Sequence, residues 1–349
     1  MTRDLTVSID AMGGDAGPGI VVAALAQSVL RHPAVRFLLH GDEAALKPLL
    51  AERPKLAPRV EIRHAPDAVR MDDKPSLVLR RGRNTSMWRA IEAVQTKDAD
   101  VAVSAGNTGA LMAMSMFQLG LIEGISRPAI AAIWPTKIGQ TIVLDVGANV
   151  GTDAQQLVEF AVMGQAFARA VFGLEKPKLG LLNVGSEEVK GNDAVKGAAQ
   201  ILRSATLPME FTGFVEGDNI SEGTVDVVVT DGFTGNIALK TAEGTAKLVI
   251  FYLRSALRRS LLGRLGGLLA SGALKTLRDK LDPRSANGGV FLGLNGVVVK
   301  SHGGTDAMGF ASALDMAVDM ARAGITANIK TDLQGIAAAT PAPQEAAAS

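Results

Sequence analysis

Cysteine is absent from the 349 residues of this chain. Its absence excludes disulfides, Cys-ligated zinc, iron–sulfur clusters and a thiol nucleophile. Aromatic residues are scarce at 4%, whereas apolar residues reach 47% and glycines number 38. Such a composition is typical of buried parallel strands that alternate with helices, and it disfavours an all-β sandwich.

The chain also lacks an excess of either charge, with 36 Lys and Arg against 35 Asp and Glu. Nothing global therefore points to nucleic acid as a partner. The first residues have no secretory-type apolar core, so a cytoplasmic location is expected. We expect one domain over residues 1–335, followed by a low-complexity, disordered tail over residues 336–349.

The longest uncharged run, residues 101–122, is about long enough to cross a bilayer. It contains Ser104, Asn107, Thr108 and Gln118, and unsatisfied polar groups are costly in lipid. We therefore interpret it as a short buried strand, a turn and a helix that begins near Thr108, with Asn107 or Thr108 as the cap.

The same order of strand, glycine-rich loop and helix recurs without a fixed period. Six such units predict a doubly wound, parallel sheet whose loops all lie along one carboxyl edge, where ligands bind. The six strands are expected at Val7–Asp10, Asp100–Ser104, Ile142–Asp145, Leu179–Leu182, Val225–Thr230 and Val297–Lys300. The polar residues of their loops are Asp10, Asp15, Asn107, Asn149, Lys190, Asn192, Asp231, Asn236 and His302.

Several of these loops have the features of an anion seat, because glycine allows close backbone approach and a helix start offers free N–H groups. Ordinary turn chemistry selects the same residues, so a single loop does not establish a site. The candidates for substrate or phosphate binding are Ser104, Gly106, Thr108, Gly109, Asp231 and Lys240.

Two lysines stand out among the loops. Lys240 lies four residues after Asn236 on one face of a helix expected to start at Thr234 or Gly235, and Lys190 lies between two glycines. Either could neutralise phosphate, and either could be a solvated surface lysine. His302 and Asp306 have the H-x-x-x-D spacing of some acyltransferases, although Asp306 could simply cap the last helix.

Familiar nucleotide and hydrolase motifs are missing. The sequence contains no G-x-x-x-x-G-K-[ST], no G-x-G-x-x-G after the first strand, no G-x-S-x-G and no H-E-x-x-H. Asp10, Asp145 and Asp231 stand at strand ends, where aspartates also cap turns. We expect neither a metal nor a cofactor.

Two segments suggest separate surfaces. Residues 72–90 concentrate positive charge, either as a solvated helix face or as a surface for an acidic partner. Residues 251–281 mix leucines with arginines, and their uncharged stretches are too short to span a bilayer. Their glycines predict a helical hairpin, inserted at about 240–282, whose apolar tip could contact an anionic membrane; a dimer interface or a core helix pair is the alternative.

Six ordered motifs together, DAMGGD, SAGNTGA, LDVGAN, GSEEVKGND, DGFTGNIALKT and KSHG, make the chain similar to the bacterial phosphate acyltransferase family over residues 5–325. The resemblance implies transfer of a long fatty acyl group from acyl carrier protein to inorganic phosphate, giving acyl phosphate for phospholipid synthesis. It also implies a Rossmann-like α/β/α sandwich with a mainly parallel sheet, a homodimer, and peripheral association with the inner face of the cell membrane.

Under that resemblance, the catalytic candidates are Asn107, Asn149, Lys190, Asn236 and His302. Carrier protein is expected at Lys74, Arg80, Arg81 and Arg83, and membrane at Leu261, Leu262, Leu265, Leu268 and Leu269. Since phosphate is itself a nucleophile, direct attack on the thioester is the simplest mechanism, and a covalent Ser104 ester is the alternative. A dehydrogenase, a short-chain phosphate acyltransferase and a non-catalytic membrane adaptor are the competing functions.

Overall fold

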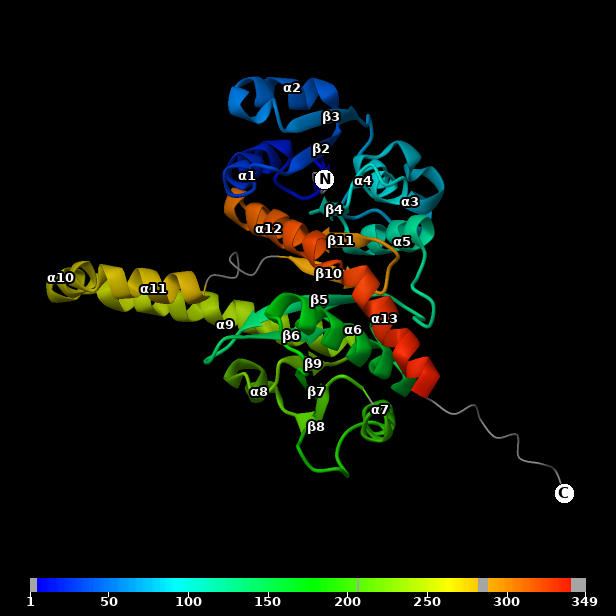
Figure 1. The fold of residues 1–349 in the computed structure, drawn as a ribbon. Coiled ribbons are helices and arrows are strands. Elements are labelled where there is room, and N and C mark those ends of the chain that lie inside the picture. Colours follow the sequence, from blue (N-terminus) through cyan, green and yellow to red (C-terminus); the bar gives the residue numbers. More distant parts are fainter. Residues whose placement is uncertain (1–4, 206, 282–287, 340–349) are drawn as a thin grey trace.

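A computed structural model describes residues 5–205, 207–281 and 288–339. Within these residues, eleven strands form one mixed and mostly parallel sheet, with helices on both faces (Figure 1). All six predicted strands are present. In spatial order the strands are β3 (Val60–His64), β2 (Arg36–Gly41), β1 (Thr6–Asp10), β4 (Val101–Ser104), β11 (Val297–Lys300), β10 (Gly289–Leu292), β5 (Ala129–Pro135), β6 (Gln140–Leu144), β9 (Val227–Val229), β7 (Lys178–Leu182) and β8 (Glu210–Val215).

The direction of the strands reverses at the centre of the sheet. β10 is antiparallel to both β11 and β5, and β5 is antiparallel to β6. After three successive antiparallel pairings, β6, β9, β7 and β8 run opposite to β1, β4 and β11. The prediction that all six loops share one edge is therefore wrong: the loops after β1, β4 and β11 lie at one edge, and those after β6, β7 and β9 lie at the other.

One face of the sheet is covered by α1 (Pro18–Arg31), α6 (Ala154–Phe172), α7 (Asp193–Ser204), α12 (Ala307–Ala323) and α13 (Ile325–Ala339). Their apolar residues pack with the odd-numbered valines of β4 and β11 in one core cluster. The other face is covered by α3 (Pro75–Arg81), α4 (Ser86–Gln95), α5 (Thr108–Leu119), α8 (Gly217–Glu222) and the first half of α9 (Gly232–Arg258). A short helix, α2 (Glu43–Ala51), packs beside α1 and β3. Since side chains alternate along a strand, the two faces collect separate cores.

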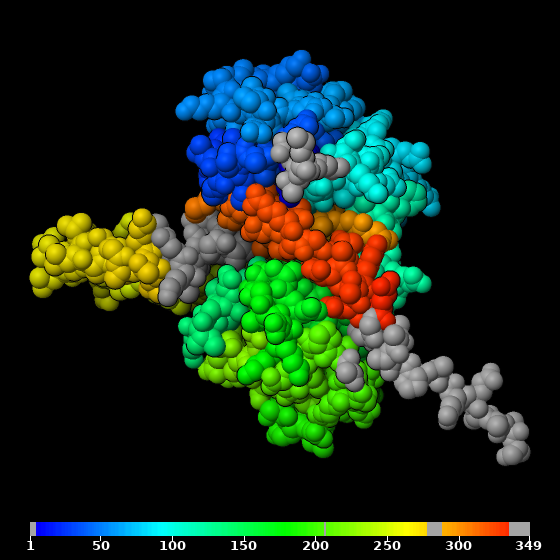
Figure 2. Space-filling model, in the orientation of Figure 1, coloured from blue at the N-terminus to red at the C-terminus, as the bar shows by residue number. Residues whose placement is uncertain are grey.

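The predicted helical hairpin is present, with three helices where two were expected. α9 runs for 27 residues and is followed by α10 (Leu261–Leu269) and α11 (Ser271–Leu281). Figures 1 and 2 show these helices projecting from the body. Serine at position 260 caps α10 through a hydrogen bond from the Gly263 N–H, and this cap starts a separate helix. No helix among the described residues is long and apolar enough to span a membrane.

Helix starts follow the caps that the sequence offers. Asn107 caps α5, which begins at Thr108 as predicted, and Asp306 caps α12. Asp231 caps α9, so this helix starts at Gly232, two or three residues earlier than predicted. The expected tail overlaps α13, which continues to Ala339; residues 340–349 of that prediction lie outside the described residues.

Candidate active site

Three neighbouring strands bring polar side chains to one face of the sheet. Ala102 of β4 and Val298 of β11 both belong to the core beneath α5 and α9. Ser104 and Lys300, two residues further along, therefore face the same side, and they are paired in register. Asp10 ends β1 on the other side of β4. The carboxyl ends of β1, β4 and β11 thus form one cluster.

At the centre of this cluster lies the buried carboxylate of Asp10. It accepts hydrogen bonds from the hydroxyls of Ser86, at 2.5 Å, and Ser104, at 2.7 Å. Burial raises the pKa of Asp10, against the lowering effect of these hydrogen bonds. A Cβ at Gly13 would lie 2.4 Å from Asp10 Oδ2 and 2.8 Å from the Gly106 nitrogen, so the loops pack this closely only without a side chain there.

The SAGN loop, residues 104–107, connects β4 to α5. The Gly106 N–H donates to Ser104 Oγ at 3.0 Å, and the Ala110 N–H donates to Asn107 Oδ1. Asn107 Nδ2 donates to the carbonyls of Met71 and Asp73. The side-chain amide of Asn107, predicted to be catalytic, therefore anchors the segment before α3. The first N–H groups of α5 follow directly after the SAGN loop.

A contact from α9 completes this cluster. Glu243 accepts a hydrogen bond from Lys240 Nζ at 2.9 Å, and its other oxygen lies 3.3 Å from His302 Nε2. Burial would raise the pKa of Glu243, but the bonds to His302 and Lys240 outweigh it and lower this pKa to about 2. Two predicted residues, Lys240 and His302, are thus brought together by Glu243, which sequence reasoning missed.

Lys300 is the second residue that sequence reasoning missed. Its ammonium donates to the Ala105 carbonyl at 3.3 Å and to the carbonyl of Ser301. Burial, with help from the charge of Lys240, lowers the pKa of Lys300 to about 8, while Asp10 and Asp15 act in the opposite direction. The sequence did contain a signal for Lys300, because it is a lysine at the end of an apolar strand whose carboxyl end was expected to bind ligands.

A second cluster forms at the end of β6. Asp145 accepts from the N–H groups of Ile130, Gly147 and Ala148, and Asn149 donates to it through both its backbone and its amide. Burial raises the pKa of Asp145 in spite of these bonds. Asn149 also donates to the Pro128 carbonyl. Its Oδ1 is buried and has no partner among the residues described.

The remaining predicted residues belong to this opposite edge. Asp231 accepts from Thr234 as the cap of α9, and exposed Asn236 lies one turn before Lys240. Lys190 pairs with Glu187 at 2.8 Å, and that hydrogen bond raises the pKa of Lys190. The structure therefore places Ser104, Gly106, Thr108, Gly109, Lys240 and His302 around one cluster and Asn149, Lys190, Asp231 and Asn236 outside it.

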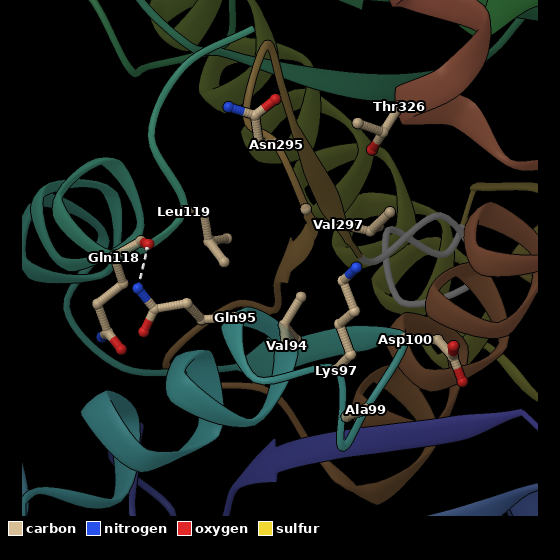
Figure 3. Close-up of a pocket in the computed structure, with 11 residues that line it drawn as sticks. Val94, Gln95, Lys97, Ala99, Asp100, Gln118, Leu119, Asn295, Val297 and Thr326 are labelled. Carbon is tan, nitrogen blue, oxygen red and sulfur yellow. Dashed lines mark hydrogen bonds between the residues drawn. The ribbon is translucent and has the colours of Figure 1, made fainter.

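A separate cavity of about 470 Å³ lies at the amino ends of β4 and β11 (Figure 3). Lys97, Asp100, Gln118 and Asn295 are among its lining residues, and none of the predicted site residues is. It is therefore distinct from the cluster around Asp10. Across the described part of the chain, no group of three or more His, Asp or Glu is arranged to hold a metal ion.

The predicted basic surface adjoins the SAGN loop. Lys74, Arg80, Arg81 and Arg83 are all exposed, on and around α3. A Cβ at Gly109 would lie 3.0 Å from Pro75 Cγ, and Asn107 holds the segment before α3. Positive charge therefore lies beside the SAGN loop.

Comparisons with known proteins place nearly the whole chain among relatives. A family model described as "Fatty acid synthesis protein" matches residues 5–328. A phosphate acyltransferase from Parvibaculum lavamentivorans is 59% identical over 341 residues, which cover 97% of this chain and 94% of the relative. A phosphate acyltransferase from Xanthobacter autotrophicus is 60% identical over 336 residues, which cover 96% of this chain and 94% of the relative.

Solved structures show the same fold at low sequence identity. A phosphotransacetylase from Streptococcus pyogenes superposes with a TM-score of 0.60 at 17% identity, covering 92% of this chain and 95% of the other. EutD phosphotransacetylase from Staphylococcus aureus superposes with a TM-score of 0.56 at 20% identity, covering 92% of this chain and 94% of the other. These likenesses support a mixed, mostly parallel α/β architecture.

Proposed function

The chain belongs to the phosphate acyltransferase family of fatty acid and phospholipid synthesis, and from this membership we propose that it transfers a long-chain acyl group from acyl carrier protein to inorganic phosphate. The observation that carries the proposal is the Asp10 cluster. There the helix start of α5, Lys240, Lys300 and His302 offer donors to an anion.

Direct attack is the step that this inventory supports. A phosphate oxygen attacks the thioester carbonyl carbon, and the carbon–sulfur bond breaks with its electron pair going to sulfur. The thiolate then takes the proton that hydrogen phosphate loses on acylation, so the products are acyl phosphate and the carrier thiol. Since the chain has no cysteine, no thiol-linked intermediate forms on it. The protein supplies alignment and stabilisation of the oxyanion, through the N–H groups at residues 107–109 and the neighbouring cations, because the Gly106 N–H is donated to Ser104 Oγ.

The proposal assigns His302 to the leaving thiolate or to phosphate, with Glu243 as a positioning residue. The Glu243 carboxylate touches His302 and Lys240 with different oxygens, so it fixes both side chains at once. Asn149 and Lys190 then support the opposite edge, through the Pro128 carbonyl and the ion pair with Glu187, and Asn236 lies one turn of α9 before Lys240.

A covalent ester on Ser104 is the competing mechanism. Ser104 is 1% exposed, and its hydroxyl is held between Asp10 and the Gly106 N–H. These contacts favour a supporting role for the hydroxyl. An acylated protein recovered from a quenched reaction would instead establish the ester.

Carrier protein is proposed to bind the basic surface of Lys74, Arg80, Arg81 and Arg83. Acyl carrier proteins are acidic, so the positive charge would speed their encounter with the enzyme. The surface borders the loop that Asn107 anchors, which supports delivery of the thioester to the SAGN loop.

The projecting helices are proposed to serve dimerisation and membrane contact. Leu261, Leu262, Leu268 and Leu269 are between 71% and 83% exposed on α10, and Leu265 is 54% exposed. Phe251 and Tyr252 are exposed on α9, nearer the body. The exposed leucines of α10, with arginines beside them, are of the kind that contact the interface of an anionic membrane. The exposed aromatic pair Phe251 and Tyr252 could pack against a second subunit.

The deciding experiment combines the protein, palmitoyl-acyl carrier protein and inorganic phosphate, with hydroxylamine to trap acyl phosphate. We expect trapping that depends on phosphate and falls when His302 is changed to Ala. Absence of product from the unmodified protein, with firm binding of the carrier, would contradict the transfer and favour the adaptor.

A further inference from the structure

Lys300 is a partly buried cation whose partners among the described residues are neutral groups. It is the last residue of β11, beside Ser104 of β4. A lysine ammonium has three N–H donors. Among the described residues, its hydrogen-bond partners are the carbonyls of Ala105 and Ser301. Both are neutral groups, so one N–H and the full charge of the ammonium are left without an anionic partner in this part of the chain.

The nearest carboxylates, Asp10 and Asp15, act on Lys300 through their charge without contacting its ammonium. Asp10 takes the hydroxyls of Ser86 and Ser104, and the described residues place no carboxylate oxygen within 4 Å of Lys300 Nζ. A partly buried charge without a carboxylate in contact is destabilised by desolvation. The cost is removed when an anion enters the space in front of the ammonium.

Which anion enters follows from the surroundings. The Ala105 carbonyl holds the ammonium against the SAGN loop, the loop that leads into the start of α5. Lys240 contributes a second positive charge from α9. A small, multiply charged oxyanion matches this set of donors better than a monovalent carboxylate does.

We propose that the Lys300 ammonium binds the phosphate substrate directly and holds it against the SAGN loop for attack on the thioester. This rests on the proposed function and deepens it, by assigning the phosphate subsite. In the step, the phosphate oxygen forms the new bond to carbon and the sulfur leaves with the electron pair. Lys300 keeps its proton throughout and acts only as a charge.

The proposal predicts a characteristic pH dependence. The charged groups that face Lys300 are Asp10, Asp15 and Lys240, with His302 and Glu243 beside them. Burial lowers the pKa of Lys300 to about 8, so the free enzyme loses this charge as the pH rises through that value. Phosphate is already largely dianionic there, so the affinity for phosphate should fall on the alkaline side.

The test compares Lys300→Met and Lys300→Arg with Lys178→Met, a control at an exposed lysine that begins β7. We expect Lys300→Met to raise the KM for phosphate roughly 10- to 100-fold, with little change in the KM for the acyl carrier. Lys300→Arg stays charged at every pH used, so its phosphate KM should lose the alkaline rise that the unmodified enzyme shows.

Binding of inorganic phosphate alone, measured by calorimetry without an acyl donor, separates the two proposals. If no acyl phosphate forms, the proposed function fails while the effect of Lys300→Met on phosphate binding still stands. Loss of carrier binding in Lys300→Met, with phosphate binding unchanged, would identify an anion on the carrier as the ligand of Lys300 and overturn the phosphate subsite. An unchanged phosphate KM in Lys300→Met, or the same alkaline rise in Lys300→Arg, would overturn the subsite; the Lys300→Arg profile decides if the Met variant does not fold.

Discussion

Two glycines of α9 offer a matched test of how the Asp145 loop packs. Gly235 is buried, and a Cβ there would lie 2.0 Å from the Asp145 carbonyl oxygen, which belongs to the backbone. Gly244 lies in the same helix, is exposed, and would meet nothing within 4 Å. Changing either glycine to alanine gains about 1 kcal/mol of helix propensity.

The overpacking penalty should separate the two variants. Displacing the Asp145 backbone costs about 3 kcal/mol, the upper part of the range for added volume in a packed core. We therefore expect Gly235→Ala to lower the free energy of unfolding by about 2 kcal/mol, and Gly244→Ala to raise it by up to about 1 kcal/mol.

Urea unfolding followed by tryptophan fluorescence measures this difference, because Trp88 and Trp134 are both buried. The slope of each transition reports whether unfolding remains comparable between variants. Equal unfolding free energies for Gly235→Ala and Gly244→Ala would refute the close approach of α9 to Asp145.

Three further predictions concern the other surfaces. The lowered pKa of Glu243 contributes stability that is present above its unfolded value of 4.5 and is lost as the pH falls toward about 2. Glu243→Gln should therefore cost about 1 kcal/mol at pH 6, after allowance for solvent screening, and almost nothing near pH 2 in urea titrations. Charge reversal at Arg80 and Arg81 should raise the apparent KM for acyl carrier protein roughly tenfold at low salt, leaving the KM for phosphate unchanged; unaltered carrier kinetics would count against this surface. Glutamate in place of Leu262 and Leu269 should abolish sedimentation with anionic vesicles while acyl phosphate formation continues, and full retention would disprove membrane contact by α10.

The local units of the fold could be predicted because each carries its own signals. An apolar strand, a glycine loop and a capping Asn or Asp define β4 with α5, and the same holds for β11 with α12. The reversal of strand direction could not be predicted in this way. It depends on β10 and β5, two apolar strands that a short turn, and no helix, connects to the next strand, and the pairing of β10 with β5 is set only by the assembled sheet.

The candidate site was predictable to the same extent. Ser104 and Gly106 lie where their motif indicated, because the motif itself builds the loop. Glu243 carries no signal in the sequence, since a glutamate on a long helix is ordinary until α9 is seen to pass His302. Asn149 and Lys190 were grouped with His302 only through the assumption of a single edge.

The reversal in the sheet also sets the direction in which the helix dipoles point. α1, α5 and α12 follow β1, β4 and β11, whereas α6, α7 and α9 follow strands of the opposite direction. In a fully parallel sheet the macrodipoles of such helices add, with one positive edge and one negative edge. Here the two sets oppose each other, so their dipoles partly offset one another, and each edge of the sheet keeps its own set of helix N-termini.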